Sequence, residues 1–322
     1  MSKEVFFLGA GFSKYLDSSY PSLKDLTEKF MPPDKNFGDI EQYLTYLVSK
    51  LPFKDEAIIY ENLAEYKRLT KIIADYFWEL GNKEIPNLSD KQNEIFKIIL
   101  DRKIPCITMN YDLLLECYLL QEKRKEDKFK NINVDSFYKF PILYMQEALT
   151  SDSSSGLNFY SPADLLKQAL PEILKLHGSI NWYYNGVSAN DTIYLYEKTD
   201  NEYVDKFRDN LSNFIIPPTL DKQSLYNHIA ITHLWKQAYK YLANAEKIYV
   251  FGYSFPKSDI SVDTLFRSAL ANNSNDYKIY IFGNSENENP RYKEIFKNKK
   301  IYEYSYGNDK NTERLLEILN SN

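Results

Sequence analysis

Short apolar runs alternate with longer stretches of helical periodicity along the chain. Most of these short runs are unbroken and do not alternate between apolar and polar residues. Strands that are buried on both faces have this pattern, as in a parallel sheet covered by helices. We therefore predict an α/β fold built on a Rossmann-like, doubly wound parallel sheet. The strand candidates are 5–8, 104–109, 173–177, 213–217, 247–251 and 278–282.

A long helical insertion separates the first two strand candidates. Apolar residues recur with the 3.6-residue period over 40–51 and again over 58–80, and Gly81 is typical of a helix end. Ser89–Gln92 has the spacing of a capping box, which predicts that another helix begins there. This first insertion spans about 36–100.

A second, mostly helical insertion spans about 113–170. It contains a serine-rich loop at 150–156 and a helix start at 161–164, where proline follows serine. We expect both insertions to form a smaller module within one domain that spans 1–322. After position 284 the pattern predicts a helix, a strand and a closing helix.

Composition narrows the class of protein. The chain has 322 residues, of which 43% are hydrophobic, and a net charge of −5. This is enough chain for a sizeable core, and the acidic balance disfavours direct nucleic-acid binding. The two cysteines, Cys106 and Cys117, cannot make a disulfide framework or a four-cysteine zinc site, so we expect no metal. The chain opens directly into a strand and has no apolar run near the roughly 18 residues of a membrane span, so we expect a cytoplasmic protein without a membrane partner.

Small and hydrogen-bonding residues follow most of the strand candidates. In a doubly wound sheet, ligands bind beyond the carboxyl ends of the strands. These residues therefore indicate one large polar ligand. They are Gly9-Ala10-Gly11-Phe12-Ser13, Thr108-Met109-Asn110-Tyr111-Asp112, His177-Gly178-Ser179, Gly252-Tyr253-Ser254 and Gly283-Asn284-Ser285.

The first of these segments has the character of a phosphate cradle. Gly9 and Gly11 resemble the opening of a G-x-G-x-x-G dinucleotide turn, with Lys14 in place of the third glycine. The helix that follows would offer backbone N–H groups and the positive end of its dipole to a diphosphate, and Ser13 adds a hydroxyl. A tight strand-to-helix turn without a ligand also explains the two glycines.

The ordered set "GAGFS", "TMNYD", "HGS", "FGYSFPKSD" and "FGNSEN" resembles the sirtuins. It is most similar to the zinc-free, sirtuin-like domains of prokaryotic antiphage defence proteins, and the resemblance covers roughly residues 4–285. In that family the fold is a Rossmann-like sheet with a helical second module, and the ligand is NAD⁺.

The resemblance implies a role for each matching residue. Gly9, Ala10, Gly11 and Ser13 would hold the diphosphate of NAD⁺. Asn110 and Asp112 would line the nicotinamide and its ribose, and His177 would be the catalytic histidine. Gly252 and Ser254 would help to bind the phosphates, and Asn284 would contact the adenosine ribose.

Two departures from the deacylating sirtuins matter. Those enzymes carry a four-cysteine zinc module after the histidine motif, whereas no cysteine follows Cys117 here. They also carry a G-I-P-x-F-R flap, whereas the corresponding "DSSYPSLKDL" keeps only Pro21.

The defence branch hydrolyses NAD⁺ to nicotinamide and ADP-ribose, which is the function that we favour. Such an enzyme would poison its own cell, so we expect self-assembly into an oligomer, a separate activating partner protein, or both.

Each assignment has a structural alternative. His177 could be a satisfied histidine at a strand end, and Asn110 could merely shape a turn. Asp112 stands before "LLLE" and could cap a helix. Ser254 and Asn284 could simply end strands, and we interpret Asp259 as a cap or first-turn acid. His228 and His233 lie five residues apart, which does not match a zinc pair on a helix, so we interpret both as structural or surface residues.

Three functions compete. The first is NAD⁺ hydrolysis. The second is a zinc-free protein deacylase or ADP-ribosyltransferase, and the third is a non-catalytic sensor of NAD⁺ or an ADP-ribose derivative. A dehydrogenase fits less well, because it predicts a third glycine near position 14.

Overall fold

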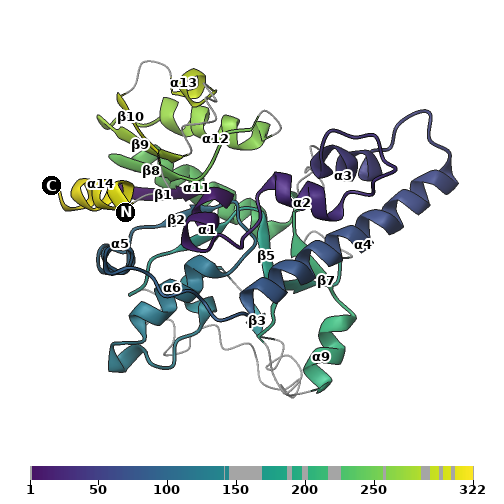
Figure 1. Ribbon diagram of the computed structural model, residues 1–322, viewed down its shortest axis with the longest axis horizontal. Helices are drawn as coiled ribbons and strands as arrows, with labels where there is room; N and C mark the ends of the chain where they lie inside the picture. The colour runs from purple at the N-terminus through teal and green to yellow at the C-terminus, as the bar shows by residue number, and fades with distance from the viewer. Residues whose placement is uncertain are drawn as a thin grey trace.

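A computed structural model describes most of the chain (Figure 1). The described residues are 2–140, 142–144, 169–186, 191–197, 202–216, 226–256, 259–283, 291–296, 300–305 and 309–321. The elements of the first half are β1 (Glu4–Leu8), α1 (Ala10–Leu16), α2 (Leu23–Phe30), α3 (Ile40–Val48), α4 (Glu56–Gly81), α5 (Asp90–Arg102), β2 (Cys106–Thr108), α6 (Leu114–Lys123), η1 (Asp127–Phe129), η2 (Val134–Phe137) and β3 (Leu143–Tyr144). Those of the second half are β4 (Ile173–Lys175), β5 (Gly178–Tyr184), β6 (Tyr194–Leu195), α9 (Glu202–Asp209), β7 (Ser212–Ile215), α11 (Ile229–Asn244), β8 (Lys247–Phe251), α12 (Ile260–Ala271), β9 (Lys278–Gly283), α13 (Arg291–Ile295), β10 (Lys300–Ser305) and α14 (Asp309–Asn320).

Six parallel strands form the central sheet, in the order β10-β9-β8-β1-β2-β4. The chain builds outward from β1 through β2 to β4, and then returns to the other side of β1 with β8, β9 and β10. This reversal is the topological switch point of a doubly wound sheet. The predicted α/β, Rossmann-like fold is therefore confirmed, including the helix, strand and closing helix after position 284.

Helices cover both faces of this sheet, as the side chains of β1 show. Phe6 and Leu8 point to the face where α1 and α5 pack, and the ring of Phe6 stacks on Tyr249. Phe7 points to the opposite face, where its ring meets Phe266 of α12. Burial on both faces explains why the predicted strands are unbroken apolar runs.

A second, four-stranded sheet lies beside the first, with the order β3-β6-β5-β7. It corrects the prediction for 213–217, because β7 pairs antiparallel with β5 and not with the parallel sheet. The strand β5 itself was missed. It begins at Gly178 with φ of +76°, where an added Cβ would lie 2.1 Å from the carbonyl oxygen of Phe214. Glycine therefore allows the chain to leave β4 and begin a different sheet within two residues.

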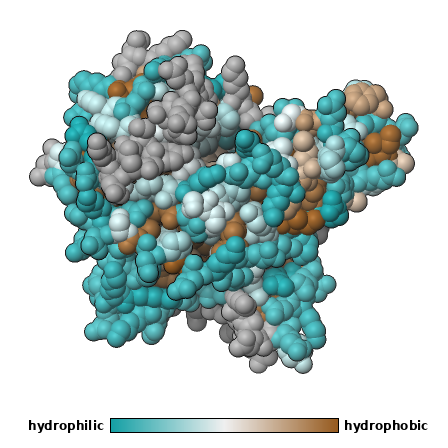
Figure 2. Space-filling model, viewed as in Figure 1, coloured by the Kyte–Doolittle hydropathy of each residue, from teal (hydrophilic) through white to brown (hydrophobic). Residues whose placement is uncertain are grey.

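The first helical insertion forms an arm, which we define as α3 and the first half of α4 (residues 40–68). Figure 1 shows this arm projecting from the body of the molecule. The predicted periods and the capping box at Ser89 are confirmed. Burial in α4 is confined to its second half, which packs on the body through Leu69, Ile73, Ala74, Phe77 and Leu80. Figure 2 shows apolar surface on the arm.

The second insertion agrees only partly with its predicted helical character. Its described residues form α6, two 3₁₀ helices and the short strand β3. The predicted loop at 150–156 and the helix start at 161–164 lie outside the described residues. Among the described helices, none is both long enough and apolar enough to cross a membrane.

The turn after β1 packs against the loop after β8 through two glycines. A Cβ on Gly9 would lie 2.5 Å from the carbonyl oxygen of Gly252. A Cβ on Gly252, where φ is +67°, would lie 2.1 Å from the amide nitrogen of Phe12. The two glycines therefore let two main chains touch at the switch point of the sheet.

We predict that Gly252→Ala lowers the free energy of unfolding by at least about 2 kcal/mol, because it adds left-handed strain to a backbone clash. Urea denaturation measures the loss. The matched control is Gly283→Ala at the end of β9, where an added Cβ has nothing within 4 Å. Equal stability of the two variants would show that the two turns are not in close contact.

Candidate functional site

The loops after four parallel strands meet at one edge of the sheet. Leu8 of β1 pairs with Thr108 of β2 on one side and with Phe251 of β8 on the other, and Thr108 pairs with Lys175 of β4. Asn110 lies two residues beyond Thr108, and His177 lies two residues beyond Lys175. The two predicted catalytic residues therefore occupy equivalent positions beyond neighbouring strands.

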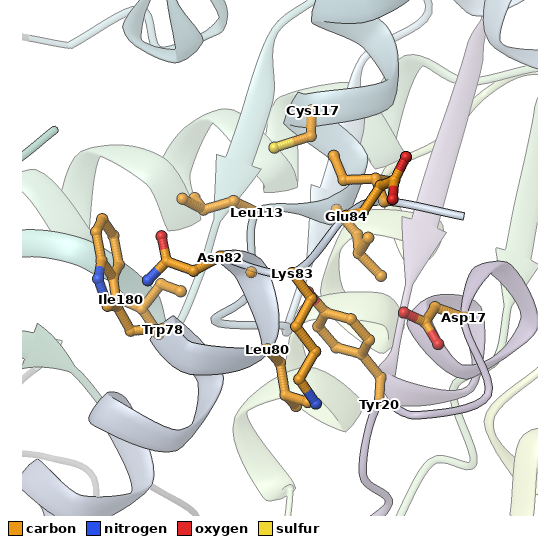
Figure 3. Close-up of a pocket in the computed structure, with 13 residues that line it drawn as sticks. Asp17, Tyr20, Trp78, Leu80, Asn82, Lys83, Glu84, Leu113, Cys117 and Ile180 are labelled. Carbon is orange, nitrogen blue, oxygen red and sulfur yellow. The ribbon is translucent and has the colours of Figure 1, made fainter. Parts of the chain in front are cut away.

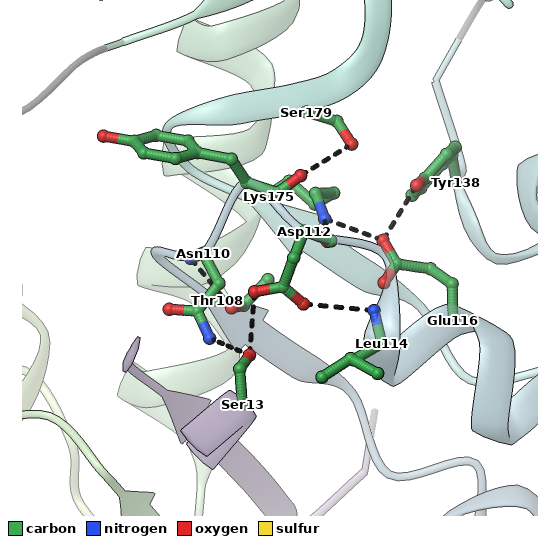
Figure 4. Close-up of polar contacts among 10 residues, drawn as sticks. Ser13, Thr108, Asn110, Asp112, Leu114, Glu116, Tyr138, Lys175 and Ser179 are labelled. Carbon is green, nitrogen blue, oxygen red and sulfur yellow. Dashed lines mark hydrogen bonds and ion pairs between the residues drawn. The ribbon is translucent and has the colours of Figure 1, made fainter. Parts of the chain in front are cut away.

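The side-chain amide of Asn110 is held by two acceptors. Its Nδ2 donates to the carbonyl oxygen of Gly9 at 3.0 Å and to Oγ of Ser13 at 2.9 Å. A carbonyl oxygen can only accept, so the nitrogen must face Gly9 and the orientation of the amide is defined. Among the described residues, Oδ1 has no hydrogen-bond partner, and Figure 4 shows it pointing away from Ser13. Asn110 therefore presents an acceptor in a fixed direction.

The hydroxyl of Ser13 links Asn110 to Asp112. It accepts from Asn110 and donates to Oδ2 of Asp112 at 2.8 Å, and the residue is only 3% exposed. A hydroxyl has a single proton to donate, so in this structure Ser13 gives that proton to Asp112. The contact of Ser13 with a diphosphate stays a prediction.

Asp112 is a buried carboxylate at the start of α6. Its Oδ1 accepts from the amide of Leu114 at 3.1 Å, although Leu113 and not Asp112 is the N-cap residue of α6. Burial raises the pKa of this carboxyl, whereas the charge of Lys175 and the hydrogen bond from Ser13 oppose that rise. Its contact with nicotinamide stays a prediction.

His177 lies in an aromatic environment and is 5% exposed. Its Nε2 is 3.3 Å from the hydroxyl of Tyr226, and its ring is roughly parallel to the rings of Tyr111 and Tyr226. Burial and the charge of Asp259 raise the pKa of Tyr226 well above its usual value, so its hydroxyl stays protonated. The sequence pattern did not reveal Tyr226, because it follows no strand and belongs to no motif.

The predicted phosphate-binding residues already contact one another. The amide of Gly11 donates to the carbonyl oxygen of Gly252 at 2.9 Å, and that of Phe12 donates to Gly9 at 2.8 Å. Ala10 and Ser254 are exposed, whereas Asn284 lies outside the described residues. Binding of NAD⁺ by Gly9, Ala10, Gly11, Gly252 and Ser254 stays a prediction.

A tyrosine and an acid near the site were not predicted to act together. The hydroxyl of Tyr253 donates to Asp259 at 2.7 Å, and Asp259 is the N-cap residue of α12, as its sequence position indicated.

The structural interpretation of His228 is confirmed, because its Nδ1 accepts from the amide of Ala230 at the start of α11.

A cavity of about 60 Å³ lies elsewhere, between the end of α4 and the start of α6 (Figure 3). Tyr20, Trp78 and Ile180 contribute apolar walls, and Asp17 and Lys83 contribute charges. None of the predicted site residues lines it. Within the part of the chain that the structure describes, no three His, Cys, Asp or Glu side chains come together as a set that could hold a metal ion.

A family model described as a SIR2-like domain matches residues 106–304. The chain belongs to this family. The matched part of this SIR2-like chain includes Asn110 and His177, and the glycine turn at 9–13 precedes it. No curated protein matches the chain.

Solved structures similar to this SIR2-like chain include a sirtuin studied for the structural basis of substrate affinity, with a TM-score of 0.44 and 13% identity over 98% of this chain and 93% of that one. Another is a Sir2 complex with a p53 peptide and NAD⁺, with a TM-score of 0.40 and 15% identity over 98% and 92%. These values are too low to transfer a function.

We predict that Asp112→Asn changes how stability depends on pH. A carboxyl whose pKa is raised by folding contributes stability below its unfolded value, near 3.8, and loses that contribution as pH rises through the folded pKa. An amide does not ionise. The free energy of unfolding of the variant, relative to that of wild type, should therefore be higher at pH 7 than at pH 4.5, as measured by urea denaturation.

A constant difference between Asp112→Asn and wild type across this range would argue against a raised pKa at Asp112.

Proposed function

We propose that this SIR2-like protein hydrolyses NAD⁺ to nicotinamide and ADP-ribose. The observation that carries the proposal is the fixed amide of Asn110, with both contacts of its nitrogen made by the glycine turn and an acceptor oxygen left over. Asn110 and His177 each lie two residues beyond the paired positions Thr108 of β2 and Lys175 of β4. An oriented acceptor beside an imidazole suits a reaction in which a hydroxyl or a water must be positioned and then deprotonated.

The chemistry needs few groups. The nicotinamide of NAD⁺ is a cationic pyridinium, so the electron pair of the C1′–N bond leaves with it and produces neutral nicotinamide without an acid. The ribose carbon becomes oxocarbenium-like, and the oxygen of a water forms the new bond to C1′. In the proposal, Asn110 accepts a hydrogen bond from that water or from a ribose hydroxyl, and His177 takes the proton.

Tyr226 is a new participant in this proposal. Its hydroxyl meets Nε2 of His177 where no substrate is present. We infer that a substrate hydroxyl or water takes that place when NAD⁺ binds, while the tyrosine ring keeps the imidazole in its plane.

Hydrolysis is favoured over protein deacylation by the residues that the chain lacks. No cysteine follows Cys117, so the sequence has no four-cysteine zinc module, and the flap that the deacylating enzymes carry is reduced to Pro21. A zinc-free deacylase or ADP-ribosyltransferase remains the alternative function, and non-catalytic sensing of NAD⁺ is the second. Nicotinamide release from NAD⁺ with and without an acylated peptide separates the three.

We also propose a role in antiphage defence, on the ground of the resemblance of the sequence to the zinc-free domains of defence proteins. An enzyme that depletes NAD⁺ would kill its own cell, so its activity must be held off until a trigger arrives. We propose control by self-assembly or by a separate partner protein. The arm carries exposed aromatic residues that suit such a contact, among them Phe53 and Tyr60, which are 75% and 71% exposed.

We predict that His177→Ala and Asn110→Ala each lower NAD⁺ turnover at least about 100-fold under activating conditions, because each removes a group that acts on the attacking hydroxyl. Nicotinamide release, followed by chromatography, is the measurement. Circular dichroism and the melting temperature should show an intact fold for both variants.

His233→Ala is the matched control, because His233 lies on α11 outside the proposed site and should keep wild-type turnover. Full activity of either Asn110→Ala or His177→Ala would refute the proposed mechanism.

A further inference from the structure

An ion pair is completely buried behind the loop that carries Asn110. Lys175 of β4 and Glu116 of α6 both have 0% side-chain exposure, and Nζ of Lys175 is 2.9 Å from Oε1 of Glu116. The same Oε1 accepts from the hydroxyl of Tyr138 at 2.8 Å. The proposed mechanism does not use this pair, although it lies next to the site in Figure 4.

Burial of this ion pair in the core is energetically unfavourable compared with burial of apolar side chains. Removing two charges from water carries a desolvation penalty that their attraction only partly repays, and apolar residues of similar volume often serve stability equally well. Moreover, Oε2 of Glu116 has no hydrogen-bond partner among the described residues. A contribution to the stability of the fold is therefore a weak explanation for the presence of Lys175 and Glu116 in the core.

The ammonium group of Lys175 does something that an apolar side chain cannot do. It donates a second hydrogen bond to the main-chain carbonyl oxygen of Asp112, which lies in the loop 109–113. This loop connects β2 to α6 and has no regular secondary structure. Lys175 therefore fixes the main chain of the loop, and Glu116 fixes Lys175.

A continuous set of contacts then leads to the proposed catalytic amide. The side chain of Asp112 accepts from Ser13, and Ser13 accepts from Asn110. Asp112 is thus held at its main chain by Lys175 and at its side chain by Ser13. A shift of its carbonyl oxygen would also move the carboxylate away from Ser13, and Asn110 would lose one of its two acceptors.

We propose that the buried Lys175–Glu116 ion pair positions the amide of Asn110 for NAD⁺ hydrolysis, by anchoring the carbonyl oxygen of Asp112. Lys175 and Glu116 are positioning residues that do not touch the substrate. This inference rests on the proposed function.

The test removes both charges together, because a single substitution would leave one buried charge unpaired and unfold the protein. In Lys175→Met/Glu116→Gln, the glutamine oxygen can still accept from Tyr138, but the donor to Asp112 is lost. We expect kcat to fall about 10- to 100-fold, while KM stays within about threefold, because misplacement affects the transition state more than binding.

The chain offers a control ion pair at the opposite end of the sheet, although its side chains are 36% and 16% exposed. Arg102 pairs with Glu4 at 3.3 Å, and Oε1 of Glu4 accepts from the hydroxyl of Tyr249 at 2.7 Å, just as Glu116 accepts from Tyr138. The variant Arg102→Met/Glu4→Gln makes the same chemical change far from Asn110. Its kcat should stay within about twofold of wild type.

A crystal structure of Lys175→Met/Glu116→Gln completes the test. A lowered kcat together with an Asn110 amide turned away from Ser13 supports positioning. Wild-type kcat overturns it, and so does a lowered kcat with Asn110 unmoved. If this variant does not fold, Lys175→Met/Glu116→Met/Tyr138→Phe replaces the whole cluster with apolar groups and is judged by the same two readouts.

The two proposals fail in different ways. Should the wild type leave NAD⁺ uncleaved under every activating condition, the proposed function fails. Positioning is then decided by the crystal structure alone, where an Asn110 amide that still contacts both Gly9 and Ser13 overturns it and a displaced amide supports it.

Discussion

The two hydrogen bonds donated by the amide of Asn110 are the constraint on which the candidate site depends. They join the loop after β2 to the glycine turn after β1, and they leave the amide oxygen pointing away from Ser13 (Figure 4). The turn can accept them because Gly9 lies against Gly252 without a side chain between the two loops. The close packing of two main chains at the switch point of the sheet therefore holds the same turn that accepts from Asn110.

Much of the fold could be predicted from the sequence, because burial on both faces produces unbroken apolar strands and a helix produces its own period. The strands at 5–8, 247–251 and 278–282 and the helix ending at Gly81 were predicted in this way. The second sheet was not. An apolar run such as 213–217 has the same composition whether it joins a parallel sheet or pairs antiparallel with β5, since partner choice depends on distant residues.

The site was predicted as a set of strand ends, but its internal contacts were not. Asn110 and Asp112 follow β2 and His177 follows β4, so the three lie beyond neighbouring strands at one edge of the sheet, while their roles stay predictions. It gave no sign of Tyr226, which follows no strand, or of the Lys175–Glu116 pair, where a lysine occupies a position in an otherwise apolar strand. That interrupted strand was the available signal, because a charged residue inside a buried run needs a partner.

The central claim is that Asn110 and His177 act on the same ribose. A crystal structure of His177→Ala with NAD⁺ tests it most directly, since the substrate should bind without being consumed. The account predicts that Oδ1 of Asn110 lies within hydrogen-bond distance, roughly 2.6–3.2 Å, of a hydroxyl of the nicotinamide ribose or of a water facing C1′. A nicotinamide ribose bound away from Asn110, with the place of the imidazole far from C1′, would contradict it.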